Sequence, residues 1–176
     1  MSKAKEVMNA HDIERTLERL ACQILEQISD PTAMALIGIQ RRGADLACRL
    51  SQMLVQRLGQ AVDCGELDIN LYRDDWTTID ATPQINTTNI NFPVTEKTIV
   101  VIDDVLFTGR TVRCALEAIL DFGRPKAVKL LVLVDRGHRE LPIQADFVGK
   151  QIVTDPGEHV YVFLQERDGQ DRVVVE

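Results

Sequence analysis

Two adjacent carboxylates, Asp103 and Asp104, follow an unbroken aliphatic run over residues 99–102. In an open α/β sheet, ligands bind beyond the carboxyl ends of the strands, so a strand that ends in two acids would deliver both into a binding crevice. Carboxylates in that place can accept hydrogen bonds from the hydroxyls of a ribose. The alternative is a solvated strand end, which is the less favoured reading because adjacent acids after a buried strand are unusual without a ligand.

The residues after the two acids can hold a phosphate. They read Val-Leu-Phe-Thr-Gly-Arg-Thr over 105–111 and open a predicted helix. Backbone N–H groups at a helix N-terminus cradle a phosphate, Gly109 permits its close approach, and the hydroxyls of Thr108 and Thr111 can donate to it. The sequence has neither G-x-x-x-x-G-K-[ST] nor G-x-G-x-x-G, so a P-loop and a dinucleotide fingerprint are excluded. Residues 103–111 therefore predict a sugar-phosphate site, with an ordinary turn before a helix as the alternative.

Hydrophobic periodicity predicts the elements that carry this site. The first half contains a helix over 12–28 capped by Asp12, a strand over 34–39, a polar turn over 40–43, a helix over 44–58 and a strand over 66–72. The second half contains a strand over 98–103, a helix over 110–122, a strand over 128–134 and short strands over 145–149, 159–164 and 172–175. An Asp168-Gly169 turn predicts a hairpin between the last two strands. Residues 73–93 show no pattern, which predicts a mobile active-site loop.

These elements predict one α/β domain over residues 1–176. Aliphatic strands that alternate with helices indicate a mostly parallel sheet flanked by helices on both faces. The late short strands indicate a small β-rich hood beside that sheet.

The composition and net charge exclude several classes of function. The 176 residues carry a net charge of −7, which argues against a generic nucleic-acid or anionic-membrane binder. No apolar run approaches the roughly 20 residues of a membrane span and no secretory signal is present, so a cytoplasmic protein is expected. Four dispersed cysteines indicate reduced, mostly buried thiols, and with three scattered histidines they offer no metal site built from side chains. The cations comprise fourteen Arg and six Lys, which favours an anionic ligand.

Residues 101–111 resemble the phosphoribosyl pyrophosphate (PRPP) signature of type I phosphoribosyltransferases. Further strings over 71–75, 109–113, 123–125 and 134–143 resemble the PyrR family, bacterial regulators of pyrimidine operons that are also uracil phosphoribosyltransferases. The likeness runs from the first helix to about residue 165. It implies the type I phosphoribosyltransferase fold and the conversion of uracil and PRPP to UMP and pyrophosphate, with Mg²⁺ bound to PRPP.

The resemblance also implies roles for individual residues. Asp103 and Asp104 would hold the ribose hydroxyls, and the 5-phosphate would be wrapped by Val105, Leu106, Phe107, Thr108, Gly109, Arg110 and Thr111. Arg41 and Arg42 fall on the family's pyrophosphate loop, where Arg42 would serve catalysis; from the sequence alone a solvated pair at a helix start is the commoner reading. Arg73 would also serve catalysis, because it begins the loop that the family closes over its substrates; a plain loop arginine is its alternative.

Base recognition is implied at two positions. Arg136 aligns with a cation that related enzymes offer to an exocyclic oxygen, and the backbone near Val160 would read the base edge; a loop arginine and a core valine are the alternatives. Purine phosphoribosyltransferases place an acid at the position of Phe107. A phenylalanine cannot exchange a proton, so uracil must lose its N–H proton by another route.

A second hypothesis is that the chain acts mainly as an RNA-binding regulator with residual catalysis. Some PyrR proteins bind a pyrimidine-operon mRNA under the control of UMP or UTP, and the candidates here are Arg15, Arg19, Arg139 and Lys150. Neutral residues such as Gln144 and the net charge of −7 favour the enzyme hypothesis, whereas the intact 134–143 string supports the regulator. A homo-oligomer, a dimer or larger, is expected from the family.

Overall fold

The computed structural model describes residues 4–73 and 87–176, and its largest element is a five-stranded parallel sheet in the order β3-β2-β4-β5-β6. The strands are β2 (Met34–Ile39), β3 (Asp63–Leu67), β4 (Thr98–Leu106), β5 (Ala127–Asp135) and β6 (Phe147–Gln151). The central strands β2, β4 and β5 are almost continuously aliphatic because helices bury both of their faces. Their carboxyl ends meet at one edge of the sheet.

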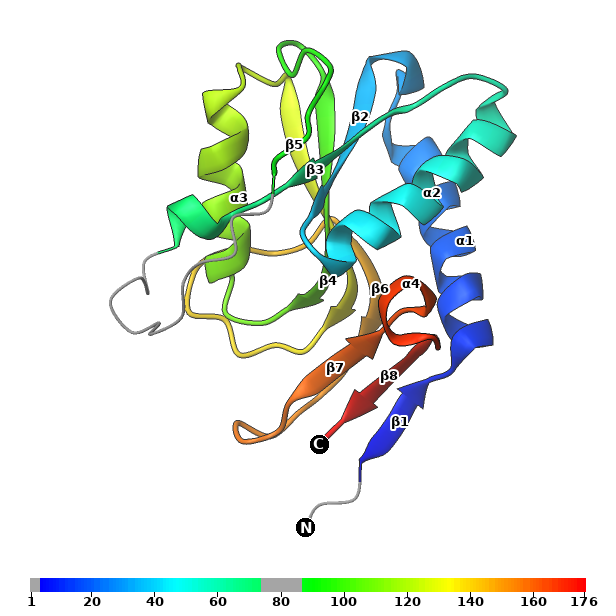
Figure 1. The fold of residues 1–176 in the computed structure, drawn as a ribbon, viewed down its shortest axis with the longest axis vertical. Helices are drawn as coiled ribbons and strands as arrows, with labels where there is room; N and C mark the ends of the chain where they lie inside the picture. The colour runs from blue at the N-terminus through cyan, green and yellow to red at the C-terminus, as the bar shows by residue number, and fades with distance from the viewer. Residues whose placement is uncertain (1–3, 74–86) are drawn as a thin grey trace.

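Helices α1 (Ala10–Gln27) and α2 (Arg42–Leu58) lie on one side of the sheet, and α3 (Arg110–Asp121) lies on the other (Figure 1). Alternate residues of each strand face opposite sides, so two apolar clusters form. Leu36, Ile102 and Leu133 pack with α1 and α2, whereas Ile37 and Val101 pack with α3. This confirms the predicted α/β architecture, a parallel sheet covered on both faces.

A second, antiparallel sheet in the order β1-β8-β7 forms the predicted hood. The hood comprises the three strands β1 (Lys5–Met8), β7 (Val160–Phe163) and β8 (Arg172–Val175), together with the short helix α4 (Gln165–Asp168) between β7 and β8. The hood lies below the carboxyl edge of the main sheet in Figure 1, and β7 contacts β4. No helix among residues 4–73 and 87–176 is long and apolar enough to cross a membrane.

Several predicted boundaries are wrong. The first helix starts at Ala10 with Asn9 as its cap, and Asp12 instead closes a capping box with reciprocal bonds of 2.9 and 3.1 Å to Asn9. The strand predicted over 66–72 covers 63–67, because residues 70–72 form a 3-10 helix. The pattern there alternates in polarity, but the chain turns toward α3, where the Tyr72 carbonyl accepts from Arg113 at 3.1 Å.

The C-terminal part also differs from the predictions. The strand predicted over 145–149 is β6, which extends the main sheet instead of joining the hood. The predicted hairpin exists as the antiparallel β7–β8 pair, but α4 connects it in place of a tight Asp168-Gly169 turn. Strand β1 was not predicted, because four residues carry too little periodicity.

Two further expectations concern the predicted loop and the cysteines. Of the loop predicted over 73–93, residues 74–86 lie outside the described part of the chain. All four cysteines are free thiols, as expected, but only Cys114 is buried. The exposed cysteines lie on helices or at a sheet edge, where the outer face is left to solvent: Cys22, Cys48 and Cys64.

Candidate functional site

The two carboxylates lie inside the carboxyl end of β4, which extends three residues beyond the predicted strand end. Asp103 is buried, with 7% of its surface exposed, and Asp104 is half-buried. Their carboxylates accept from the backbone: Asp103 Oδ1 from Asp104 N–H at 2.9 Å, and Asp104 Oδ1 from Val105 N–H at 2.9 Å. Burial, and next the charge of Asp104, raise the pKa of Asp103 well above its ordinary value. The two carboxylates therefore repel each other when both are ionised, and a hydroxyl donor or a cation would reduce this repulsion.

Asp103→Asn is expected to stabilise the unliganded protein at high pH. Because the pKa of Asp103 is higher in the folded than in the unfolded chain, its cost to stability appears as the pH rises above the ordinary carboxyl pKa and toward the folded-state value. Asparagine keeps the Oδ1 acceptor without the charge. The Tm of Asp103→Asn should exceed that of wild type at about pH 8, and the difference should shrink at about pH 4. Thermal melts at both pH values check this; an equal difference at both would contradict it.

The phosphate-loop candidates run from the last two residues of β4, through residues 107–109, into the first two residues of α3. Gly109 adopts φ = 92° as the cap of α3, a backbone conformation that glycine accepts at little cost. Thr108 Oγ1 accepts from Arg110 N–H at 3.3 Å, and the Thr108 carbonyl accepts from Glu140 N–H at 3.0 Å. Arg110 Nε donates to Glu140 at 2.6 Å. Residues 107–109 thus form a turn braced by the 134–143 segment, and the side chains of Thr108, Arg110 and Thr111 are exposed or half-buried.

The pyrophosphate-loop candidates are positioned by a close contact between α2 and β4. A Cβ on Gly43 would lie 2.4 Å from the Ile102 carbonyl oxygen and 3.2 Å from the Cα of Asp103. Glycine at this position therefore lets the start of α2 approach the carboxylate pair. Arg41, at the N-cap of α2, and Arg42, its first residue, are brought beside the end of β4 by this contact.

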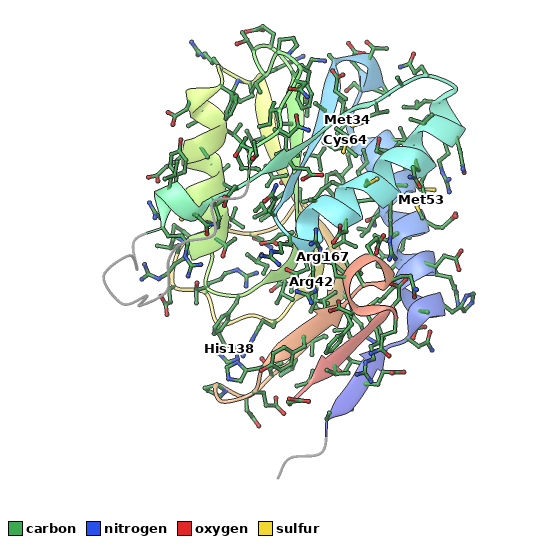
Figure 2. All side chains as sticks on the ribbon, viewed as in Figure 1. Met34, Arg42, Met53, Cys64, His138 and Arg167 are labelled. Atoms are coloured by element: carbon green, nitrogen blue, oxygen red, sulfur yellow. The ribbon has the colours of Figure 1, made fainter. Side chains whose placement is uncertain are left out.

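The hood contributes a partner to Arg42 that the sequence did not reveal. Arg42 Nη2 donates to both oxygens of Asp168, at 3.0 and 3.1 Å, and Arg167 pairs with Asp45. Figure 2 shows Arg42 and Arg167 side by side where α4 meets the start of α2. Nearby, Arg49 donates to Glu166 and Asp171 at 2.5–2.8 Å. Asp168 was predicted only as a turn residue, since nothing in the local sequence indicates a partner more than a hundred positions away.

The candidate base-binding residues face the same edge of the sheet. Arg136 follows β5 directly and is buried, with its guanidinium carbon 4.1 Å from the centre of the Phe107 ring. Val160 starts β7 and is half-buried against the larger apolar cluster. Arg73 is exposed at the last described position before residue 74. The structure thus brings together 103–111, Arg41, Arg42 and Arg136, with the hood beside them.

Three of the four RNA-binding candidates share one groove. Arg15, Arg19 and Lys150 line it together with Asp12 and Gly149, and its volume is about 420 Å³. Arg19 donates to the Gly149 carbonyl at 2.5 Å, and Lys150 donates to the Val7 carbonyl at 2.7 Å. Arg139 does not line this groove; it donates to Asp135 at 2.6 Å and to the Phe107 carbonyl at 2.9 Å.

The chain matches known proteins along most of its length. Residues 3–167 match the family model described as phosphoribosyl transferase domain. Curated relatives named bifunctional protein PyrR include that of Syntrophobacter fumaroxidans, 51% identical over 97% of this chain and 91% of its own length. The protein of the same name from Caldicellulosiruptor bescii is 48% identical over 100% of this chain and 97% of its own length.

Solved structures agree on the fold. The hypoxanthine phosphoribosyltransferase of Trypanosoma cruzi superposes with a TM-score of 0.71 at 17% identity, covering 97% of this chain and 95% of that one. A hypoxanthine-guanine phosphoribosyltransferase from Bacillus anthracis gives 0.69 at 17% identity, covering 99% and 98%. At this identity the structures support the fold alone. The family match and the relatives near half identity place the chain among the PyrR proteins of the phosphoribosyl transferase domain family.

Proposed function

We propose that this protein transfers the ribosyl phosphate of PRPP to uracil, giving UMP and pyrophosphate. The proposal depends mainly on the carboxylate pair near the end of β4. One carboxylate is buried, and the strand leads from the pair into a glycine-containing turn at a helix N-terminus. Membership of the PyrR family supports uracil as the base, because that family couples regulation of pyrimidine genes with uracil phosphoribosyl transfer. Residues 1–176 would act as one catalytic unit in the cytoplasm.

PRPP would bind across the carboxyl edge of the sheet. Its 5-phosphate accepts from the backbone N–H groups of 105–111 and from the hydroxyls of Thr108 and Thr111, where the α3 dipole also favours an anion. Its ribose hydroxyls donate to Asp103 and Asp104, which relieves the repulsion between the two carboxylates. These contacts fix the ribose so that its anomeric carbon faces the hood.

Catalysis would be electrostatic. Arg41 and Arg42 stabilise the departing pyrophosphate while the ribose develops oxocarbenium character, and the carboxylates stabilise that positive charge. Arg73 would add a cation as the loop behind it closes and excludes water. No covalent nucleophile is required.

A magnesium ion fits this site as a companion of PRPP. Among the described residues there is no cluster of three or more His, Cys, Asp or Glu that would make a protein-only metal site. Mg²⁺ binds through one or two carboxylates together with substrate phosphates and water, and Asp103 and Asp104 supply such a pair. When bound, the ion neutralises charge on the leaving pyrophosphate.

The base would bind between β5 and the hood. Arg136 donates to an exocyclic oxygen of uracil, and the backbone near Val160 reads the edge of the ring. Phe107 offers no carboxylate to the base, in contrast to the acid that purine phosphoribosyltransferases carry there. This absence favours a pyrimidine over a purine that needs a proton on its imidazole ring.

The function is tested by steady-state assay with uracil, PRPP and Mg²⁺, in which UMP and pyrophosphate are both quantified. The expected result is UMP and pyrophosphate in equal amounts and an absolute requirement for the divalent ion. Pyrophosphate release without UMP would indicate PRPP hydrolysis. No product from uracil under any condition would overturn the assignment.

A second function, RNA binding controlled by UMP or UTP, is favoured by the groove that gathers Arg15, Arg19 and Lys150. A pyrimidine-operon mRNA would place its phosphates on these cations, and a homo-oligomer would present several such grooves. Since each neutralised phosphate contributes to the salt dependence, Arg15→Gln should lower the slope of log Kd against log salt by about 1. Salt-dependent gel shifts with UMP present check this. An unchanged slope, or no saturable binding by wild type, would contradict the regulator role.

A further inference from the structure

Arg136 carries hydrogen-bond donors that the folded chain leaves unused. Only 4% of its surface is exposed, and within the described part of the chain its Nε and Nη2 atoms are buried without a hydrogen-bond partner. Its backbone is fixed, since its N–H donates to the Leu106 carbonyl at 3.1 Å and its carbonyl accepts from Thr154 Oγ1 at 3.3 Å. Unpaired buried donors are costly, so this arrangement indicates a ligand that carries acceptor atoms.

The Phe107 side chain stacks on this guanidinium and forms no hydrogen bond with its Nε and Nη2 donors. The ring centre lies 4.1 Å from the Arg136 guanidinium carbon, a cation–π distance. The ring is itself held: His138 meets it edge-on with centroids 6.3 Å apart, and Arg139 Nη1 donates to the Phe107 carbonyl at 2.9 Å. His138 in turn is fixed by a 2.7 Å bond between its Nε2 and the Thr154 carbonyl.

The chemistry of the side chain at 107 decides whether Arg136 can read a ligand. A carboxylate there would form a charge-assisted pair with the guanidinium and occupy its donors. An aromatic ring stacks on the guanidinium plane but accepts no strong hydrogen bond in that plane. The ring therefore orients the guanidinium and leaves Nε–H and Nη2–H available along one edge.

We propose that Phe107 is a positioning residue, which fixes Arg136 so that its two free donors bind a carbonyl oxygen of the base. This role rests on the proposed function and deepens it, because it assigns the positioning of Arg136, which binds the base, to a side chain within the phosphate loop. The loop then has two tasks: its backbone binds the phosphate, and its one aromatic side chain orients the group that binds the base. Loss of the ring should weaken base binding and leave phosphate binding intact.

Phe107→Leu tests this role, with Phe107→Tyr as the variant that keeps the ring and Phe122→Leu as a control. Phe122 is exposed to a similar extent, 46% against 39%, but lies at the far end of α3. Phe107→Leu is expected to raise the KM for uracil about tenfold, with a smaller change in the KM for PRPP. Phe107→Tyr should restore the uracil KM relative to Phe107→Leu.

Calorimetry with UMP and with ribose 5-phosphate provides a readout besides turnover. Phe107→Leu should weaken the binding of UMP, which contains the base. It should leave unchanged the binding of ribose 5-phosphate, which lacks the base. Equal weakening of both ligands, or a Phe107→Tyr variant as impaired as Phe107→Leu, overturns the positioning role while wild-type uracil turnover upholds the function. A wild type that neither consumes uracil nor binds UMP overturns the proposed function, and with it this role. Thermal melts confirm that each variant is folded.

Discussion

Asp104→Asn is expected to lower kcat/KM for UMP formation by about 10²–10³-fold, the usual effect of removing one preorganised electrostatic contact. The side chain is half-buried at the end of β4, and its carboxylate would accept from the ribose and offset its positive charge in the transition state. Asparagine preserves the shape and the acceptor for Val105 N–H but removes the charge. The loss should therefore appear in kcat as well as in the KM for PRPP.

Asp63→Asn provides the control for that substitution. Asp63 begins β3 at the opposite edge of the sheet, where it pairs with Lys97, so its replacement should leave kcat/KM within about twofold. If Asp104→Asn retained wild-type turnover, the site would have to lie elsewhere than residues 103–111. Equal losses in both variants would point to a general effect on the fold.

Gly43→Ala is expected to destabilise the protein by about 1–3 kcal/mol and to reduce activity by about tenfold or more. Alanine normally favours a helix by up to about 1 kcal/mol over glycine. Here the added Cβ would lie 2.4 Å from the Ile102 carbonyl oxygen. Gly43 belongs to α2 and Ile102 to β4, so neither backbone segment can shift easily. The start of α2 must move away from β4, and Arg41 and Arg42 move with it.

Urea unfolding and PRPP kinetics measure both effects. Gly157→Ala is the matched control, because nothing lies within 4 Å of a Cβ at that glycine and its substitution should be nearly neutral. If Gly43→Ala were as stable and as active as wild type, the close approach of α2 to the carboxylate pair would not be required. If the variant lost stability but kept its KM for PRPP, the contact between α2 and β4 would support the fold without positioning the PRPP site.

The parallel sheet and the phosphate loop could be predicted because their signals are local. The aliphatic runs of β2, β4 and β5 indicate strands buried on both faces. Residues 103–111 combine acids, hydroxyls and a glycine within one short continuous segment. The start of the first helix was predicted wrongly, at Asp12, because Asn9 and Asp12 are both capping residues and only the reciprocal geometry distinguishes them.

The parts that could not be predicted depend on distant contacts. The pairing of Arg42 with Asp168 joins residues 126 positions apart, and the stack of Arg136 on Phe107 joins the end of β5 to the phosphate loop, a contact that neither segment indicates on its own. The path of residues 70–72 away from the sheet likewise depends on a contact with α3. Such features arise only when segments far apart in the sequence come together in the fold.

Competition among bases directly tests whether this protein transfers ribosyl phosphate to uracil. Uracil, hypoxanthine and guanine are mixed at equal concentrations with limiting PRPP and Mg²⁺, and the nucleotide products are separated and quantified. UMP is the expected dominant product, because position 107 carries a ring instead of an acid and Arg136 offers donors to a carbonyl oxygen. Predominant formation of IMP or GMP would contradict it.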